Sequence, residues 1–165
     1  MEDYILADFH CHSKYTVGAD KSLTLEKIAR FSKLKGINLL GTGDALNPEW
    51  RKELKEKLKR EGEIYFYEGV YFLPSVELKL KTYVHIVLIL PTLEDFEDLY
   101  YILKKFGKLD KTGVPNLNLD GNEFISIVER FEYIAFPAHI FVPWQSLYGK
   151  YNSISAVSYT HLTLP

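Results

Sequence analysis

The feature that most constrains this chain is a pair of histidines one residue apart, placed directly after the first apolar run. Residues 4–7 predict a buried strand, and His10 and His12 follow it. Side chains alternate between the two faces of a strand, so we expect His10 and His12 on one side, together with Asp8. Cys11 then points to the opposite face as a small buried residue. Two imidazoles that project together form half of a metal site, although a lone pair of this spacing also occurs by chance.

Length and composition limit the possible classes of protein. The 165 residues correspond to one domain, and a hydrophobic fraction of 47% is enough for a core. The formal net charge of −2 gives no global sign of nucleic-acid binding, but it leaves room for a local basic face. The single cysteine excludes an internal disulfide and indicates a reducing, cytoplasmic compartment. We see no signal peptide, and the longest apolar run, residues 84–90, is too short to span a membrane.

Expected strands alternate with expected helices along the chain. The strands are predicted over residues 4–9, 37–40, 64–77 (as one or two strands), 82–90 and 133–136, and the helices over residues 24–35, 47–62, 92–107 and 122–131. This alternation predicts an α/β fold with a mainly parallel sheet or barrel. In barrels of that type the chemistry lies at the carboxyl ends of the strands.

Potential metal ligands recur near the ends of these strands. The candidate ligands are His10, His12, Asp44, Glu77, His85 and His139, with Asp20 in the loop after the first strand as a weaker candidate. Asp44 could instead be a turn residue, and His85, within a strand, could be a core histidine. Glu77 is harder to dismiss because a buried carboxylate needs a partner. So many donors exceed the needs of one tetrahedral zinc and suit two or three metals bridged by a carboxylate.

Four ordered motifs resemble those of the PHP (polymerase and histidinol phosphatase) superfamily. They lie at residues 8–13, 41–44, 76–78 with His85, and 137–139. Residues 41–50 and 137–144 are most similar to the endonuclease Q branch, and the resemblance extends over about residues 4–155. It implies a distorted (β/α)7 PHP barrel, here incomplete, with about the first five βα units. It also implies a DNA repair endonuclease that nicks damaged duplex DNA on the 5′ side of deaminated bases or abasic sites, using zinc, manganese or magnesium.

The resemblance also implies roles for individual residues. His10 and His12 match ligands of the first motif, and His85 and His139 match later histidine ligands. Glu77 takes the position of the bridging carboxylate. Asp44 stands where many members of the superfamily have a histidine, and we assign Glu77 and Asp44 catalytic as well as metal-binding roles. Asp20 corresponds less clearly to an acidic ligand after the first motif.

Two departures from the family pattern shape our expectations of this chain. No final Asp-x-His pair follows His139, and the downstream zinc-binding region of endonuclease Q relatives is not in the sequence. Residues 157–165 break the pattern, so we interpret residues 1–156 as a partial PHP metallo-hydrolase domain with an artefactual tail. His161, in that tail, is not offered as a ligand. We expect the chain alone to nick DNA far more slowly than a complete relative.

Other functions remain open at this stage. A histidinol-phosphatase-like enzyme for small molecules uses the same chemistry, an amidohydrolase needs a metal-bridging lysine, and an inactive metal-binding fragment needs no catalysis. Trp144 and Tyr148 either stack on a base or pack as a loop. The basic residues of segment 51–60 are interleaved with glutamates, which favours a solvated helix face over a phosphate track.

Overall fold

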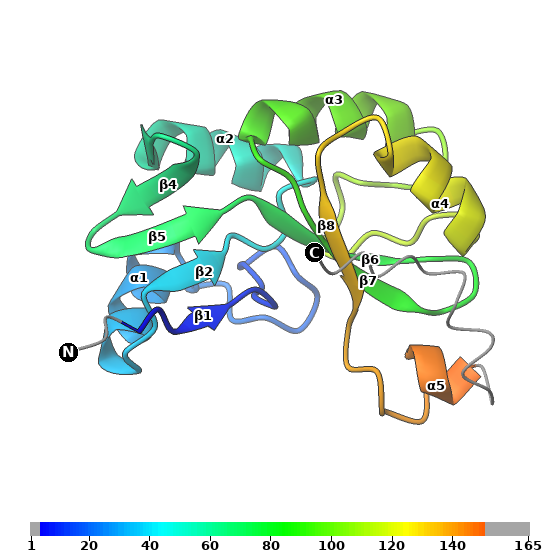
Figure 1. Cartoon of the computed structure of the whole chain (residues 1–165), viewed down its shortest axis with the longest axis horizontal. Coiled ribbons are helices and arrows are strands. Elements are labelled where there is room, and N and C mark those ends of the chain that lie inside the picture. Colours follow the sequence, from blue (N-terminus) through cyan, green and yellow to red (C-terminus); the bar gives the residue numbers. More distant parts are fainter. Residues whose placement is uncertain (1–3, 151–165) are drawn as a thin grey trace.

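Two β-sheets, joined end to end, form the framework of the computed structural model, which describes residues 4–150 (Figure 1). The first sheet has the order β1-β2-β5-β4-β3, and the second has the order β6-β7-β8. The strands of the first sheet are β1 (Ala7–Asp8), β2 (Leu39–Gly41), β5 (Val70–Leu73), β4 (Ile64–Tyr67) and β3 (Lys59–Glu61). Those of the second are β6 (Ser75–Lys79), β7 (His85–Ile89) and β8 (Ile134–Pro137).

Parallel pairing, which the alternating pattern predicts for most of the sheet or barrel, is limited to β1, β2 and β5. The remaining pairs in both sheets are antiparallel, so this part of the prediction is wrong. The short connection from β6 to β7 explains one case: Leu80 and Val84 close a hairpin, which leaves no room for the crossover that a parallel pair needs. Pro74 separates β5 from β6 and divides one extended segment between the two sheets. Within residues 4–150 the strands therefore form two open sheets rather than a closed barrel.

Three helices begin directly after the predicted starts at Thr24, Asn47 and Thr92, and a fourth begins after Asp120, which the sequence analysis did not identify as a cap. The helices are α1 (Leu25–Leu34), α2 (Pro48–Lys57), α3 (Leu93–Leu103), α4 (Gly121–Val128) and the short α5 (Leu147–Lys150). The Asn47 side chain caps α2, and Thr92 with Asp95 forms a capping box at α3. The expected extension of α2 to residue 62 is wrong, because residues 59–61 pair with β4 instead.

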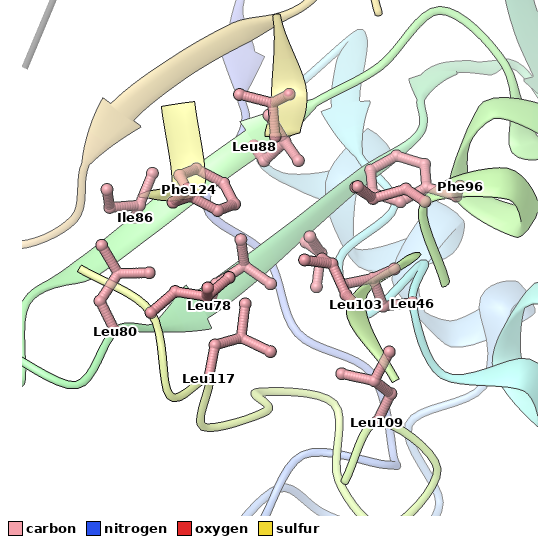
Figure 2. Close-up of a cluster of buried hydrophobic side chains, with 14 of the residues drawn as sticks. Leu46, Leu78, Leu80, Ile86, Leu88, Phe96, Leu103, Leu109, Leu117 and Phe124 are labelled. Carbon is pink, nitrogen blue, oxygen red and sulfur yellow. The ribbon is translucent and has the colours of Figure 1, made fainter. Parts of the chain in front are cut away.

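The larger hydrophobic core lies on one face of the second sheet (Figure 2). Leu78 of β6 and Leu88 of β7 pack there with Phe96 of α3 and Phe124 of α4. Because side chains alternate along a strand, the neighbouring residue Glu77 points to the opposite face, away from these helices. The core thus fixes the strand that carries the central residue of the site.

The first strand differs most from its expected burial. Tyr4, Ile5 and Leu6 are 82%, 73% and 54% exposed, whereas the apolar run predicted a buried strand. The reason is position: β1 is short, and in the described part of the chain it pairs with β2 alone at the edge of the sheet. Among the residues described, no helix has the length and apolar character required to cross a membrane.

Candidate metal centre

The Glu77 carboxylate lies between two pairs of histidines. Its Oε2 atom is 3.4 Å from Nε2 of His10 and 3.3 Å from Nε2 of His12. Its Oε1 atom is 2.7 Å from Nδ1 of His85 and 3.1 Å from Nε2 of His139. Each pair of histidines with Glu77 can offer three donor atoms that lie within 4.8 Å of one another. One carboxylate is therefore shared by two triads: the first triad (His10, His12, Glu77) and the second triad (His85, His139, Glu77).

The antiparallel sheet builds the second triad. Glu77 pairs with Val87 and Lys79 pairs with His85, so Glu77 and His85 are diagonal neighbours on one face. The expectation that Glu77 ends a strand is wrong, because it lies in the middle of β6, while His85 begins β7. The backbone N–H of Ala138 donates to the carbonyl of His85 at 3.0 Å, which brings His139 to the same place.

Two glycines after β2 allow the first triad to approach Glu77. A Cβ atom on Gly41 would lie 2.7 Å from the carbonyl oxygen of Phe9, and one on Gly43 would overlap the carbonyl of Cys11. Gly43 also has a φ of +60°, which suits glycine. The motif at residues 41–44 thus lets the segment with His10 and His12 pass close to β2, a role that the sequence analysis missed.

Asp44 is fully buried, but its carboxylate belongs to neither triad. Its Oδ2 atom accepts hydrogen bonds from the backbone N–H of Ser13 at 2.8 Å and from the Ser13 hydroxyl at 2.5 Å. The Thr16 hydroxyl lies 2.8 Å and 3.0 Å from its two oxygens. Its Oδ1 atom is 3.6 Å from Nδ1 of His12, whereas the other ring nitrogen, Nε2, faces Glu77. Asp44 is therefore placed to orient His12, and Ser13 and Thr16 are further site residues that the sequence analysis did not identify.

The remaining candidate ligand, Asp20, lies apart from the cluster, and so does Cys11, which was not expected to be a ligand. Asp20 is exposed and accepts a hydrogen bond from the backbone N–H of Ser22 at 2.8 Å, outside both triads. Cys11 packs against the smaller core as expected, and burial raises the pKa of its thiol to about 12. The predicted tail at residues 157–165, including His161, lies outside the described residues.

The electrostatics of the cluster favour a bound cation. Burial opposes ionisation of Glu77, but the adjacent imidazoles of His10 and His85 outweigh it and hold the pKa of the carboxyl well below its usual range. The Asp44 carboxylate beside His12 raises the pKa of that imidazole. Among the described residues, the buried Nε2 atoms of His10 and His85 have no hydrogen-bond partner. An unpaired buried nitrogen costs about 1–3 kcal/mol, so imidazoles and a shared carboxylate fit metal ions as their missing partners.

The basic side chains that the sequence singles out, and Lys79, differ in their partners. Lys55 and Lys57 of α2 form ion pairs with glutamates, and Arg51 is buried and donates to the carbonyls of Ala45 and Leu46. The ion pairs agree with a solvated helix face for Lys55 and Lys57, whereas residues 59–60 lie in β3 and not in the helix. Lys79 differs, because it lies on the Glu77 face of β6 and its Nζ is 4.7 Å from the ring centre of Tyr83.

The fold and the cluster together define a mixed α/β protein with a candidate two-site metal centre on its second sheet. Two solved structures are similar to it. An Endonuclease Q in complex with a 27-mer duplex substrate, with an abasic lesion at the active site, matches 90% of this chain with a TM-score of 0.85 and 38% identity. The lesion-specific endonuclease PfuEndoQ from Pyrococcus furiosus matches 96% of it with a TM-score of 0.88 and 36% identity. The predicted resemblance to endonuclease Q is thus confirmed at the level of the fold.

Curated relatives add sequence similarity without a described activity. An uncharacterized protein of Methanocaldococcus jannaschii is 34% identical over 137 residues, which cover 82% of this chain and 16% of that protein. An uncharacterized protein of Bacillus subtilis is 29% identical and matches 88% of this chain and 43% of its own length. The chain covers 38% and 40% of the two solved structures, so it spans less than half of each of these four relatives. No protein-family model matches the chain.

Proposed function

We propose that this chain carries the metal centre of a PHP-type DNA repair endonuclease, which nicks duplex DNA on the 5′ side of deaminated bases or abasic sites. The observation that carries the proposal is the position of Glu77 between two histidine pairs. The match to lesion-specific endonucleases supports DNA as the substrate. Under this proposal the two sheets are part of the distorted (β/α)7 barrel that the PHP resemblance implies.

The donor atoms favour particular ions and assign a task to each residue. The imidazole-rich triads suit zinc or manganese better than magnesium, which prefers oxygen ligands. Such ions, when bound, lower the pKa of water and stabilise charge on a phosphate. The pKa of Glu77 lies well below its usual range, so its ionised carboxylate would offset the charge of cations held by the two triads. The Thr16 hydroxyl lies 3.3 Å from Nδ1 of His12 and donates to Asp44, so the two residues together favour the proton on Nδ1 and leave the Nε2 lone pair directed at the cluster.

Lys79 provides a contact for the DNA backbone. Within the described residues no carboxylate pairs with its ammonium group, and it shares the face of β6 that carries Glu77. Residues two apart on one face of a strand are separated by about 7 Å. A phosphate next to the scissile one therefore lies within reach of Lys79, whereas Lys81 is already paired with Asp120 and Glu123.

The test combines metal content with cleavage. The purified chain is loaded with zinc or manganese, analysed for metal, and incubated with a duplex that contains one abasic site, uracil or hypoxanthine. We expect bound metal and a nick on the 5′ side of the lesion. Glu77→Gln keeps the size of the side chain but removes its charge, so it should lose both. Glu56→Gln, an exposed change of the same charge on α2, should lose neither.

Each alternative function has its own outcome in this experiment. Release of phosphate from a small phosphomonoester without a nick would favour the histidinol-phosphatase-like activity. Bound metal without any hydrolysis would favour an inactive metal-binding fragment. A folded chain without metal would refute the proposed site. The amidohydrolase interpretation is already weakened, because a glutamate rather than a lysine lies between the histidine pairs.

A further inference from the structure

The segment after the second-triad histidine His139, residues 140–149, forms a loop and the start of α5 that we call the aromatic loop. Buried side chains and a backbone hydrogen bond attach it to the rest of the structure. Leu147 is 3% exposed and belongs to the larger core, and within the loop the Ser146 hydroxyl donates to the carbonyl of Val142 at 2.5 Å. The carbonyl of Gln145 accepts a hydrogen bond from the backbone N–H of His85 at 3.3 Å. The aromatic loop is thus attached to the backbone of both histidines of the second triad.

Large aromatic side chains project outward from this anchored loop. Phe141 is 83% exposed, Trp144 is 72% exposed and Tyr148 is 37% exposed. The rings of Phe141 and Tyr148 are stacked, with centroids 5.5 Å apart and planes 1° from parallel, whereas Trp144 has no ring partner in the described part of the chain. Figure 1 shows the segment after β8 extending away from both sheets. Three aromatic rings are therefore presented to the surroundings by a backbone that is itself held in place.

We propose that the aromatic loop stacks on an unpaired nucleobase of the DNA strand that is cut, with Trp144 as the principal contact. This inference rests on the proposed function and identifies how that site holds its substrate. Phe141 is two positions from His139, so their Cα atoms are at most about 7 Å apart, and Trp144 is five positions from it, at most about 17 Å away. A base stacked on the aromatic loop therefore lies within a few nucleotides of a phosphate at the second triad.

The chemistry of the loop favours a base over a phosphate or a charged protein surface. No residue of segment 140–149 carries a charge, so the segment has no acidic side chain to repel DNA. Aromatic rings stack on every base because each base has a π-face, and one stacked base contributes about 1–3 kcal/mol. Bases in a regular duplex already stack on one another, so the loop discriminates in favour of an unpaired base at a lesion.

Binding, rather than cleavage, tests the inference. The probes are a labelled duplex with one bulged thymine and the fully paired duplex of the same length, titrated with the metal-loaded chain. Trp144→Ala should weaken binding to the bulged duplex by about 5- to 150-fold and change binding to the paired duplex less than about twofold. Tyr101→Ala, which removes an exposed ring from α3, should leave both unchanged. Thermal unfolding of both variants verifies that the fold is retained.

A second readout uses the intrinsic fluorescence of the chain. Trp50 is fully buried and Trp144 is exposed, so quenching by the bulged duplex should disappear in Trp144→Phe. Unchanged affinity of Trp144→Ala for the bulged duplex would overturn the inference. Nicking that depends on Glu77 but not on Trp144 would reject the stacking inference and leave the proposed endonuclease function standing. Trp144-dependent binding without nicking would reject the proposed activity alone.

Discussion

The most discriminating perturbation of the proposed centre is Asp44→Asn, which preserves shape and removes one buried charge. Asp44 touches no part of Glu77, so the change tests whether a carboxylate behind His12 controls the first triad. Two effects are expected, one on the stability of the fold and one on metal affinity. They must be measured separately, because an unfolded chain also loses metal.

The effect on stability follows from the hydrogen bonds of Asp44. The amide oxygen of asparagine can still accept from Ser13, whose N–H and hydroxyl both reach Oδ2. These two bonds fall from charge-assisted to neutral strength, a loss of about 0.5–1.5 kcal/mol each, or about 1–3 kcal/mol together. The amide group then faces the Thr16 hydroxyl, which can accept from it. We expect a cooperative but destabilised variant in urea unfolding without metal.

The effect on metal follows from the contact between Asp44 and His12. Loss of a carboxylate behind a ligating histidine lowers metal affinity about 10- to 100-fold. Chelator competition at 25 °C should therefore show one weakened site and one unchanged site, because His85 and His139 do not touch Asp44. Ser13→Ala removes one hydrogen bond to Asp44 but leaves its contact with His12, so its metal affinity should stay within about twofold of the parent. If both variants weaken both sites equally, Asp44 acts on the loop as a whole and the orientation argument fails.

Three further predictions concern the fold and the DNA contact. Gly43→Ala should destabilise the chain by more than about 2 kcal/mol in urea unfolding, whereas Gly62→Ala, with a similar φ and open space around it, should cost about 1–2 kcal/mol. Lys79→Gln should lower the slope of log affinity for duplex DNA against log salt by about one, and an unchanged slope would remove Lys79 from the interface. A hydrogen bond from Lys57 lowers the pKa of Glu26 to about 2. This pair therefore stabilises the fold at a pH above the ordinary pKa of glutamate, and its contribution is lost as the pH falls toward 2. Lys57→Met should therefore lower the urea midpoint slightly at pH 7 and not at pH 2, and an equal decrease at both would contradict that pairing.

Local chemistry made some elements of the fold predictable from the sequence. Asn47 before Pro48 predicts the start of α2, and Thr92 with Asp95 predicts the start of α3, because a capping side chain acts within three residues. The glycine after α1 has a φ of +74°, as its position suggests. These signals require no knowledge of distant segments.

Features that depend on pairing between distant segments were not predictable in the same way. The lysine- and glutamate-rich residues 59–61 favour a continued helix, and pairing with β4 overrides that preference. The direction of β7 depends on a hairpin whose length the sequence pattern did not define. Asp44 follows a strand as expected, yet hydroxyls from the loop after β1 determine where its carboxylate points. Strand ends therefore identified candidate ligands, but not which of them face one another.

The two triads are built with unequal rigidity, and this inequality sets an order of metal binding. Two members of the second triad, Glu77 and His85, lie in an antiparallel sheet whose other face is packed against α3 and α4, and their side chains are only 5% and 11% exposed, whereas His139 follows β8 and is 30% exposed. The first triad comes from a loop after an edge strand, with His10 and His12 33% and 32% exposed. Preorganised ligands lose less entropy on binding, so the second triad should fill first in a metal titration. His85→Ala should abolish the tighter phase and His10→Ala the weaker one, and the reverse assignment would contradict the argument from rigidity.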